Sequence, residues 1–244
     1  MINFFRKIRK KLADDNKPLK YMRYAIGEII LVVVGILIAL SINNWNEGRK
    51  DRIIEKSILL ELGDNLERNI TLIDIANAEI IEINKGTTTI IEIIEERKSY
   101  PDTLIYHFDK LNRSGSYLLK LNTTGYESLK NIGFEILTSK VLKKEILSLF
   151  EISYRSYNRE TEVINAAWGA NPTWWRDYFY IRSSKPGWIP LDYSTLIEDR
   201  KFMTNVRELE AGRKKVLEQM ILCRAQTQKV LKLIKNELVK SNVE

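Results

Sequence analysis

Few side chains in this sequence can act as nucleophiles, metal ligands or proton-transfer groups at a shared site. His107 is the only histidine and Cys223 the only cysteine of the 244 residues. No His/Cys metal spacing can be assembled from them. A Ser-His-Asp or Cys-His arrangement would require His107, which lies in the stretch YHFD without a recognisable motif. We therefore predict no catalytic residue, no metal site and no cofactor, and we do not expect the chain to be an enzyme.

The remaining reactive groups have plain structural interpretations. The sequence has no Gly-rich phosphate loop, and carboxylate pairs such as Glu95-Glu96 fall on predicted helix surfaces, where solvated charge is the default. Cys223 lies on the apolar stripe of the last predicted helix and, as a single cysteine, cannot form an internal disulfide. We expect it to be a buried small hydrophobe. His107 is expected to be structural or simply exposed.

The segment 168–188 combines aromatic residues with prolines and glycines and is predicted to be irregular. Such a segment can pack as local core, anchor a protein partner or line a small-ligand pocket. Trp174 and Trp175 are the candidate contact residues of this aromatic loop. Its aromatic residues are Trp168, Trp174, Trp175, Tyr178, Phe179, Tyr180 and Trp188.

A long apolar stretch lies near the start of the chain, between Tyr24 and Trp45. The twelve residues from Ile29 to Leu40 include no polar side chain. A helix over 24–42 would be about 28 Å long, close to the thickness of a bilayer's hydrocarbon core. We therefore predict a transmembrane helix at 24–45, with Trp45 as an aromatic anchor at one membrane interface.

The flanking charges predict the orientation of this helix. Residues 1–23 carry eight Lys/Arg and two Asp, whereas four Lys/Arg follow the apolar stretch closely. The positive-inside rule then places the basic leader 1–23 in the cytoplasm and the domain 46–244 on the other side of the membrane. Residues 46–244 have a net charge of about +2, which does not indicate nucleic-acid binding. The alternative is a signal peptide cleaved near Ala39-Leu40-Ser41.

Polar and small residues near the apolar stretch suggest contacts with lipid or with another helix. Met1–Leu12 has the pattern of an interfacial basic helix, although a disordered tail would serve the topology equally well. Glu28 is interpreted as snorkelling to the headgroups or, alternatively, as a proton-relay or partner-pairing group. Gly35 and Ala39 form a small-xxx-small pair that permits homodimerisation through this face.

Four sequence segments carry a resemblance to a known family. They are FFRKIR at 4–9, YAIGEIILVVVGILIAL at 24–40, INNWNE at 42–47 and GYESLKNIG at 125–133. The chain resembles an uncharacterised family of single-span membrane proteins from Bacteroidota. This resemblance implies a topology and a taxonomic context, and it assigns no catalytic residue.

Apolar residues spaced by three or four predict helices throughout 46–244. The transmembrane helix is expected to continue as a stalk with one apolar stripe as far as Lys85. The residues expected to point away from this stripe are Glu61, Asp64, Asn65 and Arg68. A shorter second helix is expected from Gly86-Thr87, with a strand at 87–94 as the alternative. The stripe consists of Leu59, Leu62, Leu66, Ile70, Ile73, Ala76, Ile80 and Ile83.

Later helices are predicted from caps and from the same periodicity. Asn122-Thr123-Thr124 is an N-cap cluster for a short helix that closes at Gly133. A helix over 139–167 and a final helix from Ser194 would complete an all-α, antiparallel helical bundle outside the cytoplasm. Only 87–94 and 176–182 could be strand by composition.

The sequence thus favours a bitopic inner-membrane protein whose periplasmic domain binds an envelope protein partner, as a scaffold or accessory subunit. The alternative is a sensor that binds a small ligand at the aromatic loop 168–188. Only about 20 residues face the cytoplasm, so a sensor would have to signal through a membrane partner.

Overall fold

The computed structural model describes residues 18–112, 119–168, 173–182 and 185–240. Most of these residues are helical, so the prediction of a mostly helical chain is confirmed. The predicted interfacial helix at 1–12 lies outside the described residues. The chain divides into two compact units, one up to Ile54 and the other from Glu55 onward.

Helix α2, Pro18–Glu95, contains both the apolar stretch and the predicted stalk. The predicted break at Gly86-Thr87 is wrong, because α2 continues to Glu95. The apolar stripe persists beyond this point, with Ile90 and Ile94 at 0% and 3% exposure. Burial therefore outweighs the weak helix propensity of this β-branched segment. Gly86 serves packing here, since an added Cβ would lie 3.1 Å from Nδ1 of His107.

The other elements follow in chain order and belong to the second unit. Their bounds are α3 Leu104–Asn112, α4 Thr124–Ile132, η1 Phe134–Ile136, α5 Lys140–Leu147, η2 Ser148–Ser153, α6 Tyr154–Trp168, η3 Thr173–Asp177, β1 Phe179–Arg182, β2 Lys185–Pro190, α7 Tyr193–Glu198 and α8 Arg200–Lys240.

The predicted helix over 139–167 is present, but a π-helical turn, η2, separates α5 from α6. The short helix α4 ends where the sequence predicted, at Gly133, which has a φ of 107° that favours glycine. The predicted final helix is divided at Asp199. The Asp199 carboxylate accepts hydrogen bonds from the backbone N–H groups of Lys201 and Phe202, and thereby caps α8.

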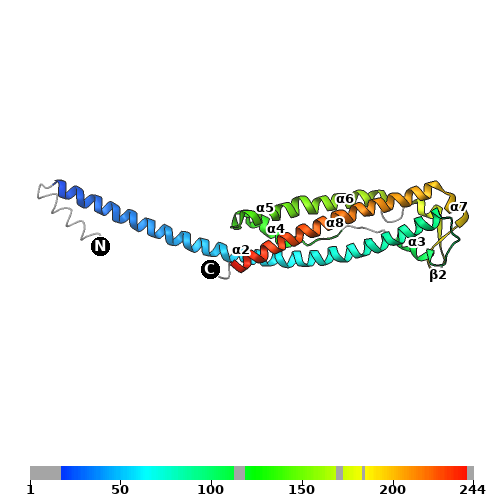
Figure 1. Cartoon of the computed structure of the whole chain (residues 1–244). Coiled ribbons are helices and arrows are strands. Elements are labelled where there is room, and N and C mark those ends of the chain that lie inside the picture. The colour runs from blue at the N-terminus through cyan, green and yellow to red at the C-terminus, as the bar shows by residue number, and fades with distance from the viewer. Residues whose placement is uncertain (1–17, 113–118, 169–172, 183–184, 241–244) are drawn as a thin grey trace. The chain divides into compact units, whose positions relative to one another are not determined.

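Within the second unit, α8 lies beside both α2 and the α5–α6 segment (Figure 1). Its ion pairs with α2 join Arg224 to Asp74 and Lys235 to Glu67, so residue numbers rise along one helix as they fall along the other. Its ion pairs with α5 and α6 show the same order, because Lys229 contacts Glu145 and Lys215 contacts Glu160. Helix α8 therefore runs in the opposite direction to both neighbours.

The buried apolar residues form two clusters along these helices. The first joins α2 between Ile58 and Ile80 to α4, α5, η2, α6 and the part of α8 from Val216 onward. The second joins Ile90 and Ile94 to α3, Trp175, Phe179 and the start of α8. Each helix thus contributes one apolar face, as the spacing predicted.

The all-α prediction is wrong in one place, since β1 and β2 form an antiparallel hairpin. Tyr180 pairs with Ile189 and Ile181 with Trp188. Gly187 permits this hairpin to approach α3, because its φ is 123° and an added Cβ would lie 2.8 Å from Cγ1 of Ile105. A larger residue would have to displace the Ile105 side chain.

Candidate functional sites

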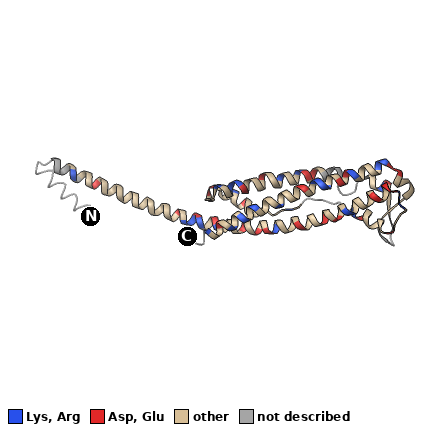
Figure 2. Ribbon diagram, viewed as in Figure 1, with Lys and Arg blue, Asp and Glu red and all other residues tan. Residues whose placement is uncertain are grey.

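The apolar part of α2 is exposed in the structure. From Ile29 to Asn46 it contains no Asp, Glu, Lys or Arg, and Figure 2 shows this stretch as uncharged ribbon. Its large apolar side chains are 46–69% exposed between Ile29 and Leu40. This helix is long and apolar enough to cross a membrane and lies near the N-terminus. A contiguous exposed apolar surface of this kind marks contact with lipid or protein.

Polar groups at the end of this stretch are satisfied locally. The Ser41 hydroxyl donates to the carbonyl oxygen of Leu37 at 2.8 Å, which lets a serine sit in an apolar helix. The Asn43 amide donates to Glu47 at 3.1 Å. Trp45 is 70% exposed, as an interfacial anchor would be in a single chain.

The candidate dimer residues face open space within one chain. Gly35 and Ala39 are both exposed, and an added Cβ at Gly35 would meet no heavy atom within 4 Å among the described residues. Glu28 lies one residue before the apolar run and is partly buried. Gly35 and Ala39 therefore leave a helix face that a second helix could cover.

The two tryptophans of the aromatic loop belong to the second apolar cluster. Trp175 is 2% exposed and stacks on Phe179, with ring centroids 4.1 Å apart and an interplanar angle of 18°. Trp174 packs partly buried against Trp175 in a T-shaped contact. The rings of Phe108, Trp188 and Phe202 also pack around Trp175. This arrangement matches the local-core interpretation of the loop.

His107 and Cys223 do not meet in a common site. His107 lies on α3, where burial and then Lys110 lower the pKa of its imidazole. Cys223 lies on α8, where it is 2% exposed and its thiol donates to the Ser153 carbonyl oxygen at 3.2 Å. Burial raises the pKa of Cys223 to about 11, so the reactive thiolate is disfavoured. The prediction of a buried cysteine is confirmed.

Carboxylates at the surface are engaged by basic side chains. Glu95 pairs with Arg207, and Glu96 pairs with Lys98. Among the described residues, no group of three or more His, Cys, Asp or Glu side chains is arranged to hold a metal ion. The pair Glu95-Glu96 is therefore a solvated, ion-paired surface feature.

Buried amides on α2 fix the segment that leads into α4. Asn69, which is fully buried, accepts from the backbone N–H of Asn122 at 2.7 Å and donates to the carbonyl oxygen of the same residue at 2.9 Å. Asn65 accepts from the backbone N–H of Gly125 at 2.8 Å. The prediction that Asn65 points away from the apolar stripe is wrong, because it is 5% exposed.

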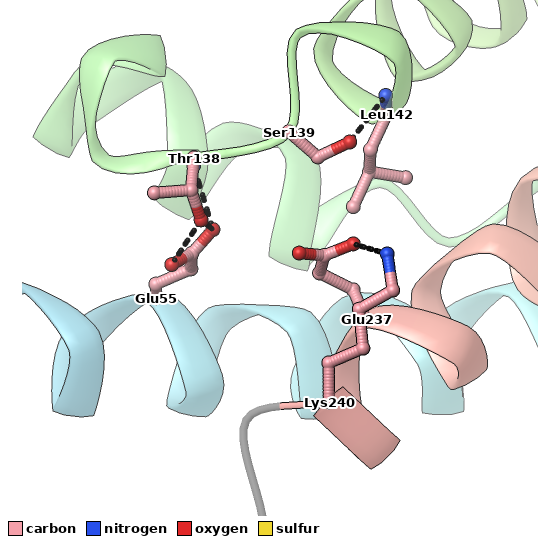
Figure 3. A network of polar contacts seen from close by, with 6 residues as sticks. All are labelled: Glu55, Thr138, Ser139, Leu142, Glu237 and Lys240. Carbon is pink, nitrogen blue, oxygen red and sulfur yellow. Dashed lines mark hydrogen bonds and ion pairs between the residues drawn. The ribbon is translucent and has the colours of Figure 1, made fainter. Parts of the chain in front are cut away.

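The segment before α5 is fixed in the same way by Glu55 (Figure 3). The Glu55 carboxylate accepts from the backbone N–H of Thr138 at 2.8 Å, and the Thr138 hydroxyl lies 2.7 Å from the same oxygen. Ser139 then caps α5 by accepting from the backbone N–H of Leu142. Glu55 is only 4% exposed, so it acts as a buried anchor between α2 and this segment.

A buried arginine joins the two apolar clusters. Arg213 of α8 is 0% exposed and donates to the Thr87 hydroxyl at 2.9 Å and to the Leu111 carbonyl oxygen at 2.7 Å. Leu111 lies in the last turn of α3, where the helix dipole favours a cation. The sequence contains a signal for the burial of this residue, because Arg213 lies at the helical spacing between Leu209 and Val216 on the apolar stripe of α8.

A groove of about 490 Å³, here called the Tyr126 groove, lies beside α4. Its walls come from segment 119–123, from α4, and from η2 together with α6. Its floor includes Tyr126 and Phe150, whose rings stack with centroids 4.2 Å apart and an interplanar angle of 3°. The Tyr126 hydroxyl donates to Glu151 at 2.5 Å. Burial and this bond raise the pKa of Tyr126 above its ordinary value, so the phenol stays neutral.

A comparison with known protein families assigns the chain to one of them. The sequence profile of the DUF6090 family, a family of unknown function, matches residues 28–167. The chain belongs to this family. The match spans the apolar part of α2, the Tyr126 groove and α6, and it ends before the hairpin and α8. No curated protein and no solved structure matches the chain. The predicted membership of an uncharacterised family is thus confirmed.

Proposed function

We propose that this DUF6090 protein is a single-pass protein of a bacterial inner membrane. Segment 24–45 crosses the bilayer, leader 1–23 faces the cytoplasm and domain 46–244 faces the periplasm. The observation that carries this proposal is the exposed apolar surface between Ile29 and Leu40, which water would disfavour and lipid would cover. The basic leader supports the orientation.

The periplasmic domain is proposed to be an antiparallel helical bundle that acts as an interaction scaffold or accessory subunit, without catalytic turnover. Support comes from the buried anchors Glu55, Asn65 and Asn69, which hold the connections around α4 and α5 in place on α2. A rigid helical frame that presents fixed connecting segments suits recognition of a partner protein, because little ordering entropy is lost on binding.

The sensor hypothesis has less support. A ligand at the aromatic loop would need free ring faces on Trp174 and Trp175, and Trp175 is 2% exposed and stacked on Phe179. These contacts favour a core role for the loop. A small-molecule sensor would therefore have to use another part of the domain.

Self-association through Gly35 and Ala39 forms part of the proposal. Close approach of two helices requires small residues at the contact, and Gly35 has room on this face. We expect Gly35→Leu to weaken cross-linking of the full chain in native membranes without reducing its insertion. Gly48→Leu, outside the apolar run, is the control. Equal cross-linking of Gly35→Leu and the unmodified chain would contradict the dimer.

The scaffold role is tested by photo-cross-linking of the full chain in cells. A photoreactive residue is placed in turn at several exposed positions of the domain, and the adducts are identified by mass spectrometry. The proposal expects one envelope protein to recur at neighbouring positions on one surface, and the same protein to co-purify with the unmodified chain. Adducts that are scattered over unrelated proteins at every position would contradict a scaffold role.

A further inference from the structure

The rim of the Tyr126 groove carries charges of both signs in equal number. Lys120, Lys130 and Arg155 provide three positive charges, and Glu127, Glu151 and Glu162 provide three negative ones. Five of these six side chains are exposed, and Glu151 is partly buried. A lining of zero net charge does not complement a polyanion such as nucleic acid or a phosphate-rich surface. It complements an occupant that itself carries both signs.

Ion pairs hold part of this rim in a defined arrangement. Glu127 pairs with Lys130 at 3.3 Å, and Glu151 pairs with Arg155 at 2.6 Å. The Lys130 ammonium also lies 5.6 Å from the centroid of the Tyr126 ring. These contacts place donors and acceptors at fixed positions around an aromatic floor, which is the pattern of a polar rim around an apolar centre in protein interfaces.

The wall formed by η2 has a backbone that departs from the α-helix. A single π-helical turn costs regular hydrogen bonding and occurs frequently at functional sites. Here η2 includes Phe150, which stacks on Tyr126, and Glu151, which accepts from the Tyr126 hydroxyl. The irregular turn thus supplies both a floor residue and a rim residue of the groove.

We propose that the Tyr126 groove binds an extended segment of a partner protein, in which an apolar side chain is flanked by residues of both charges. The apolar side chain packs on the partly buried Leu119 and Leu121, beside the buried rings of Tyr126 and Phe150, and the flanking charges pair with the rim. The volume of about 490 Å³ lies in the usual range for ligand sites. This inference rests on the proposed scaffold function and gives it a location.

The test uses the purified full chain in detergent micelles and a displayed library of random short peptides as the probe. Enriched peptides are then synthesised and their affinities measured by fluorescence anisotropy. The inference expects enriched peptides to share an apolar or aromatic residue between basic and acidic residues. No enrichment over empty micelles, or enriched peptides of a single charge sign, would overturn it.

Two variants locate the binding. Lys120→Glu combined with Glu162→Lys exchanges two rim charges at constant net charge, and Thr123→Trp fills the groove from an exposed position. Each is expected to weaken peptide binding about tenfold, because like charges or a bulky ring then face the peptide. The matched control, Glu208→Lys combined with Lys232→Glu on α8, should leave the affinity unchanged. Binding that survives both groove variants would overturn the inference.

The same variants separate this inference from the scaffold proposal. If a single envelope partner is cross-linked in cells and its adduct persists in both groove variants, the scaffold role stands and the Tyr126 groove is not its site. If peptides bind the groove but no partner recurs in cells, the scaffold role fails and the groove remains a peptide site. Vesicles of anionic lipid serve as a further probe, and rim-dependent binding to them would overturn the peptide assignment.

Discussion

Two regions of one helix, α2, use apolar residues in opposite ways. Between Ile29 and Leu40 apolar side chains surround the helix and are 46–69% exposed. Between Ile58 and Ile94 most of them form a buried stripe, whereas others such as Leu60 and Ile75 are exposed, and charged residues recur along this part of the helix. The same residue types therefore serve two environments, and the pattern around the helix distinguishes them. An all-round apolar surface suits lipid, and a single stripe suits packing within a water-soluble domain.

The largest expected contrast comes from the same substitution in both regions. Leu66 is 0% exposed and Leu31 is 69% exposed. Leu66→Ala should lower the free energy of unfolding of the domain by about 2–5 kcal/mol, because it leaves a cavity in the first cluster. Leu31→Ala should leave it unchanged. Urea unfolding of the full chain in mild detergent, followed by circular dichroism, measures both. Equal losses for the two variants would contradict the comparison.

A charge introduced at two leucines of similar exposure should affect the apolar stretch more than the domain, which is the reverse of the leucine-to-alanine result. Leu37 and Leu60 are 56% and 51% exposed in a single chain. Leu37→Arg should raise the cost of membrane insertion by about 2.5–3.5 kcal/mol. Leu60→Arg should change domain stability by no more than about 0.5 kcal/mol and leave insertion intact. The membrane-integrated fraction of each variant gives the answer, and unimpaired insertion of Leu37→Arg would show that Leu37 does not face lipid.

A glycine comparison gives a smaller effect. An added Cβ at Gly125 would lie 2.9 Å from the backbone N and Cα of Leu62, whereas at Gly35 it would meet no described residue within 4 Å. Gly125→Ala should therefore destabilise the domain by about 1–3 kcal/mol through overpacking against α2. Gly35→Ala should not affect the unfolding of the domain. If Gly125→Ala unfolds like the unmodified chain, the close approach of α4 to α2 is incorrect.

The smallest effect is electrostatic and concerns a helix cap in the second unit. The Asp192 carboxylate caps α7 by accepting hydrogen bonds from the backbone N–H and the hydroxyl of Ser194 and from the hydroxyl of Thr195. These hydrogen bonds lower the pKa of Asp192 to about 2. A lowered pKa contributes stability above the unfolded value of about 3.9 that is lost as pH falls towards 2. Asp192→Ala should therefore speed hydrogen exchange in α7 at pH about 5, with a difference that shrinks near pH 2. If the difference in exchange rate between Asp192→Ala and the unmodified chain does not depend on pH, the ionised carboxylate does not stabilise α7.

Periodicity was sufficient to predict the helices and most of their buried faces. In the helix predicted at 139–167, the apolar residues that recur every three or four positions are all buried, namely Leu142, Ile146, Leu149, Phe150, Tyr154 and Tyr157. The break predicted at Gly86 was wrong because local propensity is weaker than burial of Ile90 and Ile94. The hairpin of β1 and β2 was missed as a pair, because its close approach to Ile105 of α3 at Gly187 joins segments that are far apart in sequence.

The polar anchors show where sequence patterns lose information. Asn65, Asn69 and Arg213 lie among apolar stripe residues, and their types alone suggest exposure. Their hydrogen-bond partners are the backbone of segments 122–125 and the carbonyl oxygen of Leu111, distant in sequence. Such pairings depend on tertiary contacts that no local spacing encodes. The Tyr126 groove was missed for the same reason, since its walls come from separate elements.

The membrane topology is the central claim, and site-specific thiol labelling tests it most directly. Single cysteines replace Asn16 in the leader and the exposed Glu208 in α8, in a chain whose native Cys223 is replaced by serine. A membrane-impermeant thiol reagent is added to cells with a permeabilised outer membrane. The account predicts that Glu208→Cys is labelled at once and Asn16→Cys only after the inner membrane is lysed. Labelling of Asn16→Cys before lysis, or recovery of the chain in the soluble fraction, would contradict it.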